Sequence, residues 1–95
     1  MSEDVLSGAS PQPSQPAPVE DKAALEIELM DLLAYIYLQN ALPDKAAVLV
    51  AARDVLQPND PRALLMLAVA QVRSAKPQRA LNTLDRLALL GAMDA

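Results

Sequence analysis

The sequence repeats one pattern twice, at an offset of 34 residues. The stretch LPDKAAVLVAARDVL begins at Leu42 and KPQRALNTLDRLALL begins at Lys76; each has a proline second, a basic residue fourth and an alanine fifth, followed by an apolar run with helical spacing. A fixed period of this length indicates a supersecondary unit that is used more than once and buries its apolar face on its neighbour. The pairs that share the offset are Leu33 and Leu67, Ala34 and Ala68, Ala41 and Ala75, Pro43 and Pro77, Ala46 and Ala80, Val50 and Leu84, and Leu56 and Leu90.

Prolines and short polar residues divide the chain from Asp21 onward into four predicted helices. Asp21 is expected to cap the first helix, Pro43 and Pro77 suit the first turns of the second and fourth, and Asn59 or Asp60 can cap the third. The helices are predicted over residues 21 to about 40, 43 to about 57, 61 to about 73 and 77 to about 90. No strand pattern is present, and short connections make consecutive helices antiparallel neighbours. We therefore predict an all-α fold of two helix-turn-helix repeats.

The first twenty residues differ in composition from the rest of the chain. They contain Pro11, Pro13, Pro16 and Pro18 among Ser, Gln, Gly and Ala, a composition that buries too little apolar surface to offset chain entropy. We therefore predict two regions: residues 1–20 as a disordered tail and residues 21–95 as one helical domain.

Several classes of function are excluded by composition. The chain has no cysteine and no histidine, which removes disulfides, thiolate chemistry, the usual zinc ligand sets and histidine acid–base catalysis. We expect no enzymatic activity, no metal and no cofactor. The longest apolar run, Ala63 to Ala70, is far shorter than the ~20 residues of a membrane helix, and the first residues lack the features of a secretory signal. These patterns predict a soluble, cytoplasmic protein without membrane insertion.

Basic residues gather in the second half of the chain, which could serve nucleic-acid binding. The net charge is nevertheless −4, and two tyrosines are the only aromatic residues for base stacking. We expect no nucleic-acid partner. The basic residues concerned are Arg62, Arg73, Lys76, Arg79 and Arg86.

The period and the residue types resemble the tetratricopeptide repeat, a 34-residue helix-turn-helix unit. The first repeat, residues 27–60, has Tyr37 and Pro58 where that family favours them. Both repeats depart from the family: Met30 and Leu64 replace its tryptophan, Ala41 and Ala75 are among the alanines that replace its glycines, and Gln71 replaces a tyrosine in the second repeat, residues 61–93. The alternative is an ordinary four-helix bundle with accidental periodicity.

The resemblance implies a protein-binding groove that is lined by the first helix of each repeat. It assigns partner contacts to an apolar strip with polar ends, which suits an extended or helical segment of a partner. A single residue of this set could instead face the core, and the exposed fourth helix, with Leu84 and Leu87, is the alternative interface. The predicted partner-binding residues are Tyr35, Leu38, Gln39, Leu65, Val69, Val72 and Arg73, with Asp31 beside them.

Two repeats without a capping helix leave apolar surface uncovered, so we also expect an obligate partner or self-association. A narrower resemblance concerns the stretch from Leu32 to Val72, with its LPDKA turn and QPNDPRA junction. It is similar to the small bacterial type III secretion chaperones of the YscY and YscG kind. That resemblance implies a cytoplasmic chaperone that holds an apolar segment of a secretion-system subunit, or pairs with a co-chaperone, before export. The alternative is a generic tetratricopeptide adaptor between proteins.

Overall fold

The computed structural model describes residues 19–94, which form four α-helices and no strand. The helices are α2 (Val19–Gln39), α3 (Pro43–Leu56), α4 (Pro61–Arg73) and α5 (Pro77–Asp94). The predicted all-α fold of four antiparallel helices is confirmed. The tail predicted for residues 1–20 lies outside the described residues, apart from its last two, which open α2.

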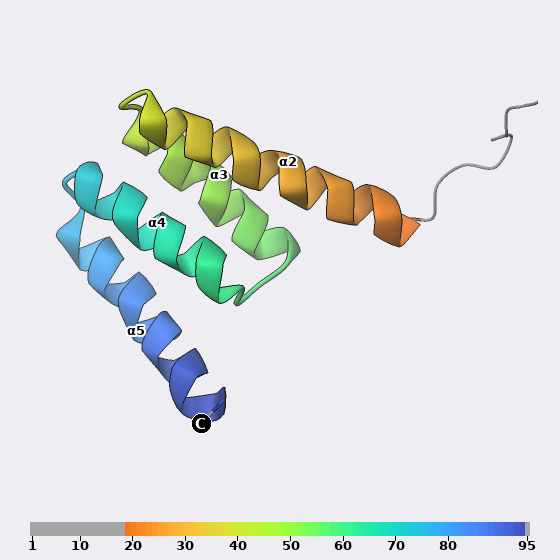
Figure 1. The fold of residues 1–95 in the computed structure, drawn as a ribbon. Coiled ribbons are helices and arrows are strands. Elements are labelled where there is room, and N and C mark those ends of the chain that lie inside the picture. The colour runs from red at the N-terminus through yellow and green to blue at the C-terminus, as the bar shows by residue number, and fades with distance from the viewer. Residues whose placement is uncertain (1–18, 95) are drawn as a thin grey trace, which may run out of the picture.

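Each helix packs side by side with the next along the chain, and α4 also touches α2 (Figure 1). The two hairpins, α2 with α3 and α4 with α5, therefore stack as repeated units. The first turns of α2 project beyond the other helices (Figure 1), and residues 21–26 are all exposed. None of the helices in the described part of the chain is long and apolar enough to cross a membrane.

The start of α2 differs from the prediction. The helix begins at Val19, so Asp21 lies inside its first turn and is not its N-cap. The starts of the other three helices follow the predicted punctuation because proline has no N–H to lose at a first helical position, whereas α5 ends at Asp94 and not at about residue 90 as predicted. Pro43, Pro61 and Pro77 each begin a helix.

The turns inside the two hairpins have the same backbone geometry. Ala41 and Ala75 both adopt a left-handed conformation with φ of 59°. The next N–H groups, of Leu42 and Lys76, donate to the carbonyls of Tyr37 and Gln71, 2.8 and 2.9 Å away. This is the Schellman ending of a helix, in which a left-handed residue satisfies the last free carbonyls. The sequence repeat is therefore also a repeat of conformation.

The core consists mostly of small side chains at the helix contacts. Ala34, Ala46 and Ala80, which share the 34-residue offset with other alanines, are buried, and such small side chains let helix axes come together. Leu64 and Val50 are the largest fully buried side chains. Leu33 on α2, at one end of the helix stack, is 40% exposed. Its repeat partner Leu67 is buried between α3 and α4.

Candidate partner-binding groove

Three of the predicted contact residues form an apolar cluster along α4. Leu65, Val69 and Val72 are 53%, 38% and 62% exposed, and their spacing of four and three residues places them on one face of the helix. Together with Ala68, Arg73 and Leu84 they line a shallow hollow of about 260 Å³. We call this surface the α4 groove.

The opposite face of α4 explains why these residues point outward. Ala63, Leu64, Leu67 and Ala70 are buried against the neighbouring helices, so α4 already uses another face for the core. An amphipathic helix with one apolar stripe would be polar at the remaining positions. α4 instead continues to be apolar at Leu65, Val69 and Val72. This second apolar face has no role in the core of the described chain.

The predicted contact residues of α2 lie beside the α4 groove and not within it. Tyr35 and Gln39 are exposed and joined by a hydrogen bond of 2.8 Å from the Gln39 amide to the Tyr35 hydroxyl. Leu38 is half-buried, and its carbonyl accepts a bond of 3.5 Å from Arg73 Nη1. The two predicted groups therefore meet at the C-terminal ends of α2 and α4. Of the seven residues, the groove gathers the four that belong to α4.

Leu84 links the two interfaces that the sequence left as alternatives. It belongs to the fourth helix, which was the alternative interface, and it lines the same hollow as Leu65 and Val69. It is 41% exposed, while Leu87 is more deeply buried. The α4 groove is therefore formed between the two helices of the second hairpin.

A buried arginine that the sequence analysis did not identify holds the two hairpins together. Arg53 on α3 is 3% exposed. Its Nε and Nη2 donate to the Asp31 carboxylate at 2.8 and 3.2 Å, Nη2 also donates to Asp60 at 3.0 Å, and Nη1 donates to the Gln57 carbonyl at 3.1 Å. The bond to Asp31 and the Coulombic attraction of both carboxylates raise the pKa of Arg53. A charge stays in the interior only when it is fully paired in this way.

The position of Arg53 in the repeat is the feature of the sequence that could have identified it as a structural residue. Its counterpart 34 residues later is Leu87, so a charged residue stands where the second repeat has an apolar one. Asp60 takes part as both ion-pair partner and N-cap of α4, accepting from the N–H groups of Arg62 and Ala63. Burial raises the pKa of Asp60, but these hydrogen bonds and Arg53 outweigh it, and the pKa lies below its ordinary value.

A second arginine fastens α5 to α3. Arg86 donates to Asp54, with Nη1 2.9 Å from Oδ2, and to the Asn59 side chain at 2.9 Å. The hydrogen bond from Arg86 is the largest influence on the Asp54 carboxyl, and it lowers the pKa of Asp54 despite partial burial. Both arginines thus bind residues at the turn between α3 and α4, one from each side.

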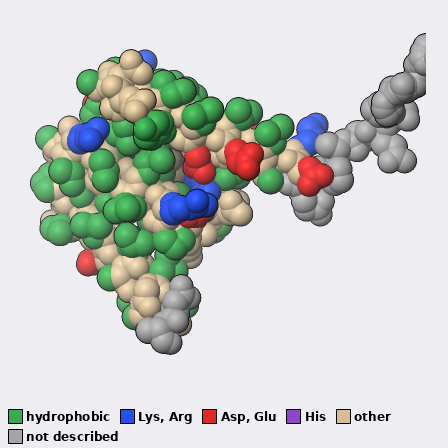
Figure 2. All heavy atoms as spheres, viewed as in Figure 1, with side chains coloured by type: hydrophobic (Ala, Val, Ile, Leu, Met, Phe, Trp, Pro, Cys, Tyr) green, Lys and Arg blue, Asp and Glu red, His purple; other side chains and the backbone are tan. Residues whose placement is uncertain are grey.

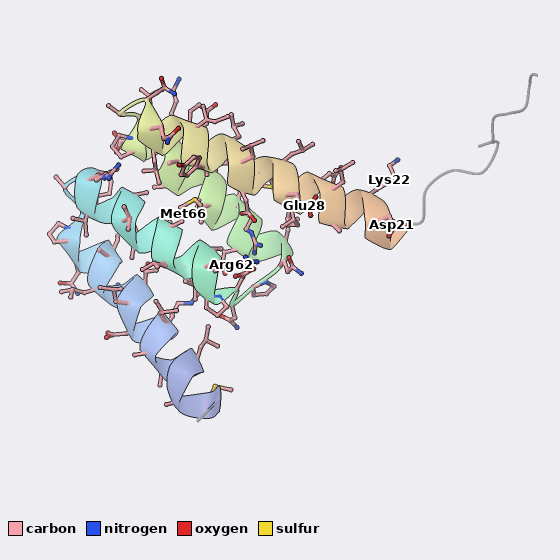
Figure 3. The ribbon with its side chains drawn as sticks, in the orientation of Figure 1. Asp21, Lys22, Glu28, Arg62 and Met66 are labelled. Carbon is pink, nitrogen blue, oxygen red and sulfur yellow. The ribbon has the colours of Figure 1, made fainter. Side chains whose placement is uncertain are left out.

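A wider hollow of about 600 Å³ lies between the projecting part of α2 and the start of α4. Glu28 on α2 and Arg62 at the start of α4 belong to its lining (Figure 3). Three of its charged residues form the ion pairs described above, in which Arg53 binds both Asp31 and Asp60. Within the described residues, no group of three potential metal ligands is present. The hollow is therefore part of the junction between the two hairpins.

Comparisons of this chain with protein-family models, with curated proteins and with solved structures found no match.

Proposed function

We propose that this chain is a small bacterial chaperone of the type III secretion kind, whose α4 groove holds an apolar segment of a secretion-system subunit before export. The observation that carries the protein-binding part is the exposed apolar face of Leu65, Val69 and Val72, next to Leu84, on a helix whose other face already forms the core. Contiguous exposed apolar patches mark binding surfaces. The secretion part rests on the resemblance of the LPDKA turn and QPNDPRA junction.

The groove suits an amphipathic helix or a short extended apolar segment. Fully burying an aliphatic side chain contributes ~1.5–3 kcal/mol to the free energy of binding. Covering several half-exposed side chains is therefore enough to hold a partner that must later be released. Arg73 at the end of the groove offers a bidentate donor for a carboxylate of the partner. Tyr35 and Gln39 extend the same side of the molecule with polar contacts.

The test is recovery of the partner from the native host with the tagged full-length chain, followed by binding measurements with the purified pair. We expect the wild-type chain to bind a secretion-system subunit, and the variants Leu65→Asp and Val69→Asp to lose it, because a carboxylate in an apolar contact must give up its hydration. Val55→Asp is the matched control, since Val55 on α3 is 79% exposed and lies outside the groove.

Two results would redirect the proposal. A partner unrelated to secretion, bound through Leu65 and Val69, would favour the generic adaptor. Unchanged binding by both groove variants, with helical content intact, would show that the α4 groove is not the interface.

A further inference from the structure

The side of α2 that faces away from α3 carries an apolar stripe. Leu25, Leu29, Leu32 and Ile36 are 42–57% exposed. Their spacing of four, three and four residues is that of a coiled-coil seam. The core-facing residues Ile27 and Ala34 are buried on the opposite side of the same helix. We call the four exposed residues the α2 stripe.

We propose that the α2 stripe pairs with the α2 stripe of a second copy of this chain, antiparallel and about a two-fold axis. The spacing reads the same in both directions along the helix. An antiparallel partner therefore places Leu29 beside Leu32 of the other copy, and Leu25 beside Ile36, in four matched layers. The stripe uses a different face from the α4 groove, so this pairing does not depend on the proposed function.

The distribution of charge along α2 selects the antiparallel orientation. The exposed acids Asp21, Glu26 and Glu28 lie in the first half of the helix, against a single base, Lys22. Residues 32–39 carry no charge. Figure 2 shows the acidic side chains along the projecting part of α2, and Figure 3 places Asp21 and Lys22 at its far end. A parallel pair would set acids against acids, whereas an antiparallel pair sets Glu28, Glu26 and Asp21 beside the uncharged residues Leu33, Tyr35 and Asn40 of the other copy.

Packing disfavours a head-to-tail arrangement, in which α2 of one copy would lie on α5 of the next as α4 lies on α3. At that internal contact α4 presents Ala63 and Ala70, both buried. The equivalent positions of α2 hold Leu29 and Ile36, which would push the helices apart. The buried Arg53 that holds the internal contact also has an apolar equivalent, Leu87.

The chain's own first 18 residues are poorly suited to cover the stripe. Their large apolar residues are Met1, Val5 and Leu6, and four prolines follow. Such a segment cannot supply an apolar residue for each of four layers spaced three and four apart. The α2 helix of a second copy supplies an apolar residue for all four layers.

The experiment measures the mass of the full-length chain by sedimentation equilibrium across the micromolar range. We expect a dimer for the wild-type chain. Leu29→Glu should raise its dissociation constant at least about 100-fold, because the substitution enters two symmetry-related layers and strips hydration from each carboxylate. Circular dichroism should show the same helical content, since Leu29 lies opposite the core.

A charge-exchange pair tests the register. Leu29→Lys and Leu32→Glu should each be monomeric alone, and an equimolar mixture should form a heterodimer, because the new lysine of one copy lies beside the new glutamate of the other. In a parallel dimer position 29 would face position 29, so the mixture would gain no contact between the new lysine and the new glutamate.

Leu81→Glu is the matched control, since Leu81 on α5 is as exposed as the stripe but lies on the opposite edge of the molecule. It should leave the dimer intact. A monomeric wild-type chain, or a dimer that Leu81→Glu disrupts and Leu29→Glu does not, would overturn the proposal.

Discussion

Ala41 and Ala75 carry a conformational cost that the repeat imposes at both hairpin turns. Their φ of 59° lies in the left-handed region, where an L-residue pays ~1–2 kcal/mol because Cβ crowds the following carbonyl. Glycine avoids this cost. The hydrogen bonds that each turn makes to the end of its helix hold the alanine there.

Replacing Ala41 or Ala75 by glycine should therefore stabilise the protein. The relief of Cβ crowding exceeds the extra entropy that glycine gives the unfolded chain, which is ~0.4–1 kcal/mol, so we expect a gain of about 0.5–1 kcal/mol in the free energy of unfolding. Urea unfolding followed by circular dichroism measures it. Ala51→Gly, at an exposed position inside α3, should instead cost about 1 kcal/mol. A loss of stability in both turn variants would contradict the argument.

The Asp54 carboxylate makes stability depend on pH. Its hydrogen bond to Arg86 lowers the pKa below the ordinary 3.8, so the folded state holds the charged form more strongly than the unfolded state does. The contribution is present above about pH 4 and is lost as pH falls through the lowered pKa of the folded state.

We expect Asp54→Asn to be less stable than the wild type at neutral pH and to lose less stability on acidification. Urea unfolding at a series of pH values from neutral to 3 measures both curves. Parallel curves for the two proteins would show that Asp54 does not contribute to acid unfolding.

At the scale of elements, α3 is the helix on which both hairpins depend. It packs between α2 and α4. Its Arg53 binds Asp31 of α2 and Asp60, the N-cap of α4. Its Asp54 binds Arg86 of α5. The ion pairs of Arg53 and of Arg86 differ in exposure: the Arg53 side chain is 4% exposed and the Arg86 side chain is 42% exposed. Burial makes the first pair costly to break, because its partners lose bonds that water only partly replaces.

Arg53→Ala should destabilise the protein by about 2–4 kcal/mol, which is close to the entire stability of a domain of this size. Arg86→Ala should cost about 1 kcal/mol or less, since exposed pairs are screened by water. The midpoint and amplitude of thermal unfolding, followed by circular dichroism, distinguish the two. Equal losses of stability in both variants would mean that burial does not increase the contribution of the Arg53 ion pairs to stability.

As a whole, the molecule has a small interior and two exposed apolar edges. Among residues 19–94, Leu64 and Val50 alone are large and fully buried, while the α2 stripe and Leu81 and Leu89 of α5 remain exposed at the two ends of the helix stack. A fold with so little core is stabilised by anything that covers an edge.

We expect the unfolding temperature of the wild-type chain to rise with protein concentration, because a dimer through the α2 stripe links association to folding. Leu29→Glu should abolish this dependence and leave a lower, constant unfolding temperature. Differential scanning calorimetry over a wide concentration range measures both. A wild-type unfolding temperature that does not change with concentration would count against the dimer.

Much of the local structure could be predicted from the sequence. Pro43, Pro61 and Pro77 begin helices because of the backbone chemistry of proline, and the 34-residue offset places Ala34, Ala46, Ala68 and Ala80 at close contacts. Leu65, Val69 and Val72, which the sequence assigns to a partner-binding strip, are exposed, and their role in binding stays a prediction. These features depend on chain-local rules and on the periodicity of one helix face.

Only the tertiary structure decided how separate faces combine. Leu84 joins Leu65 in one hollow while Tyr35 stays outside it, and Arg53 is buried among Asp31, Asp60 and a carbonyl from different parts of the chain. Neither could be predicted, because periodicity places a residue on a face of its own helix but does not state which residues of other helices meet that face. Leu33 and Leu67 show the same limit: equal in sequence and in the repeat, one is exposed and one is buried, since α4 lies between α3 and α5 whereas α2 lies at one end of the helix stack.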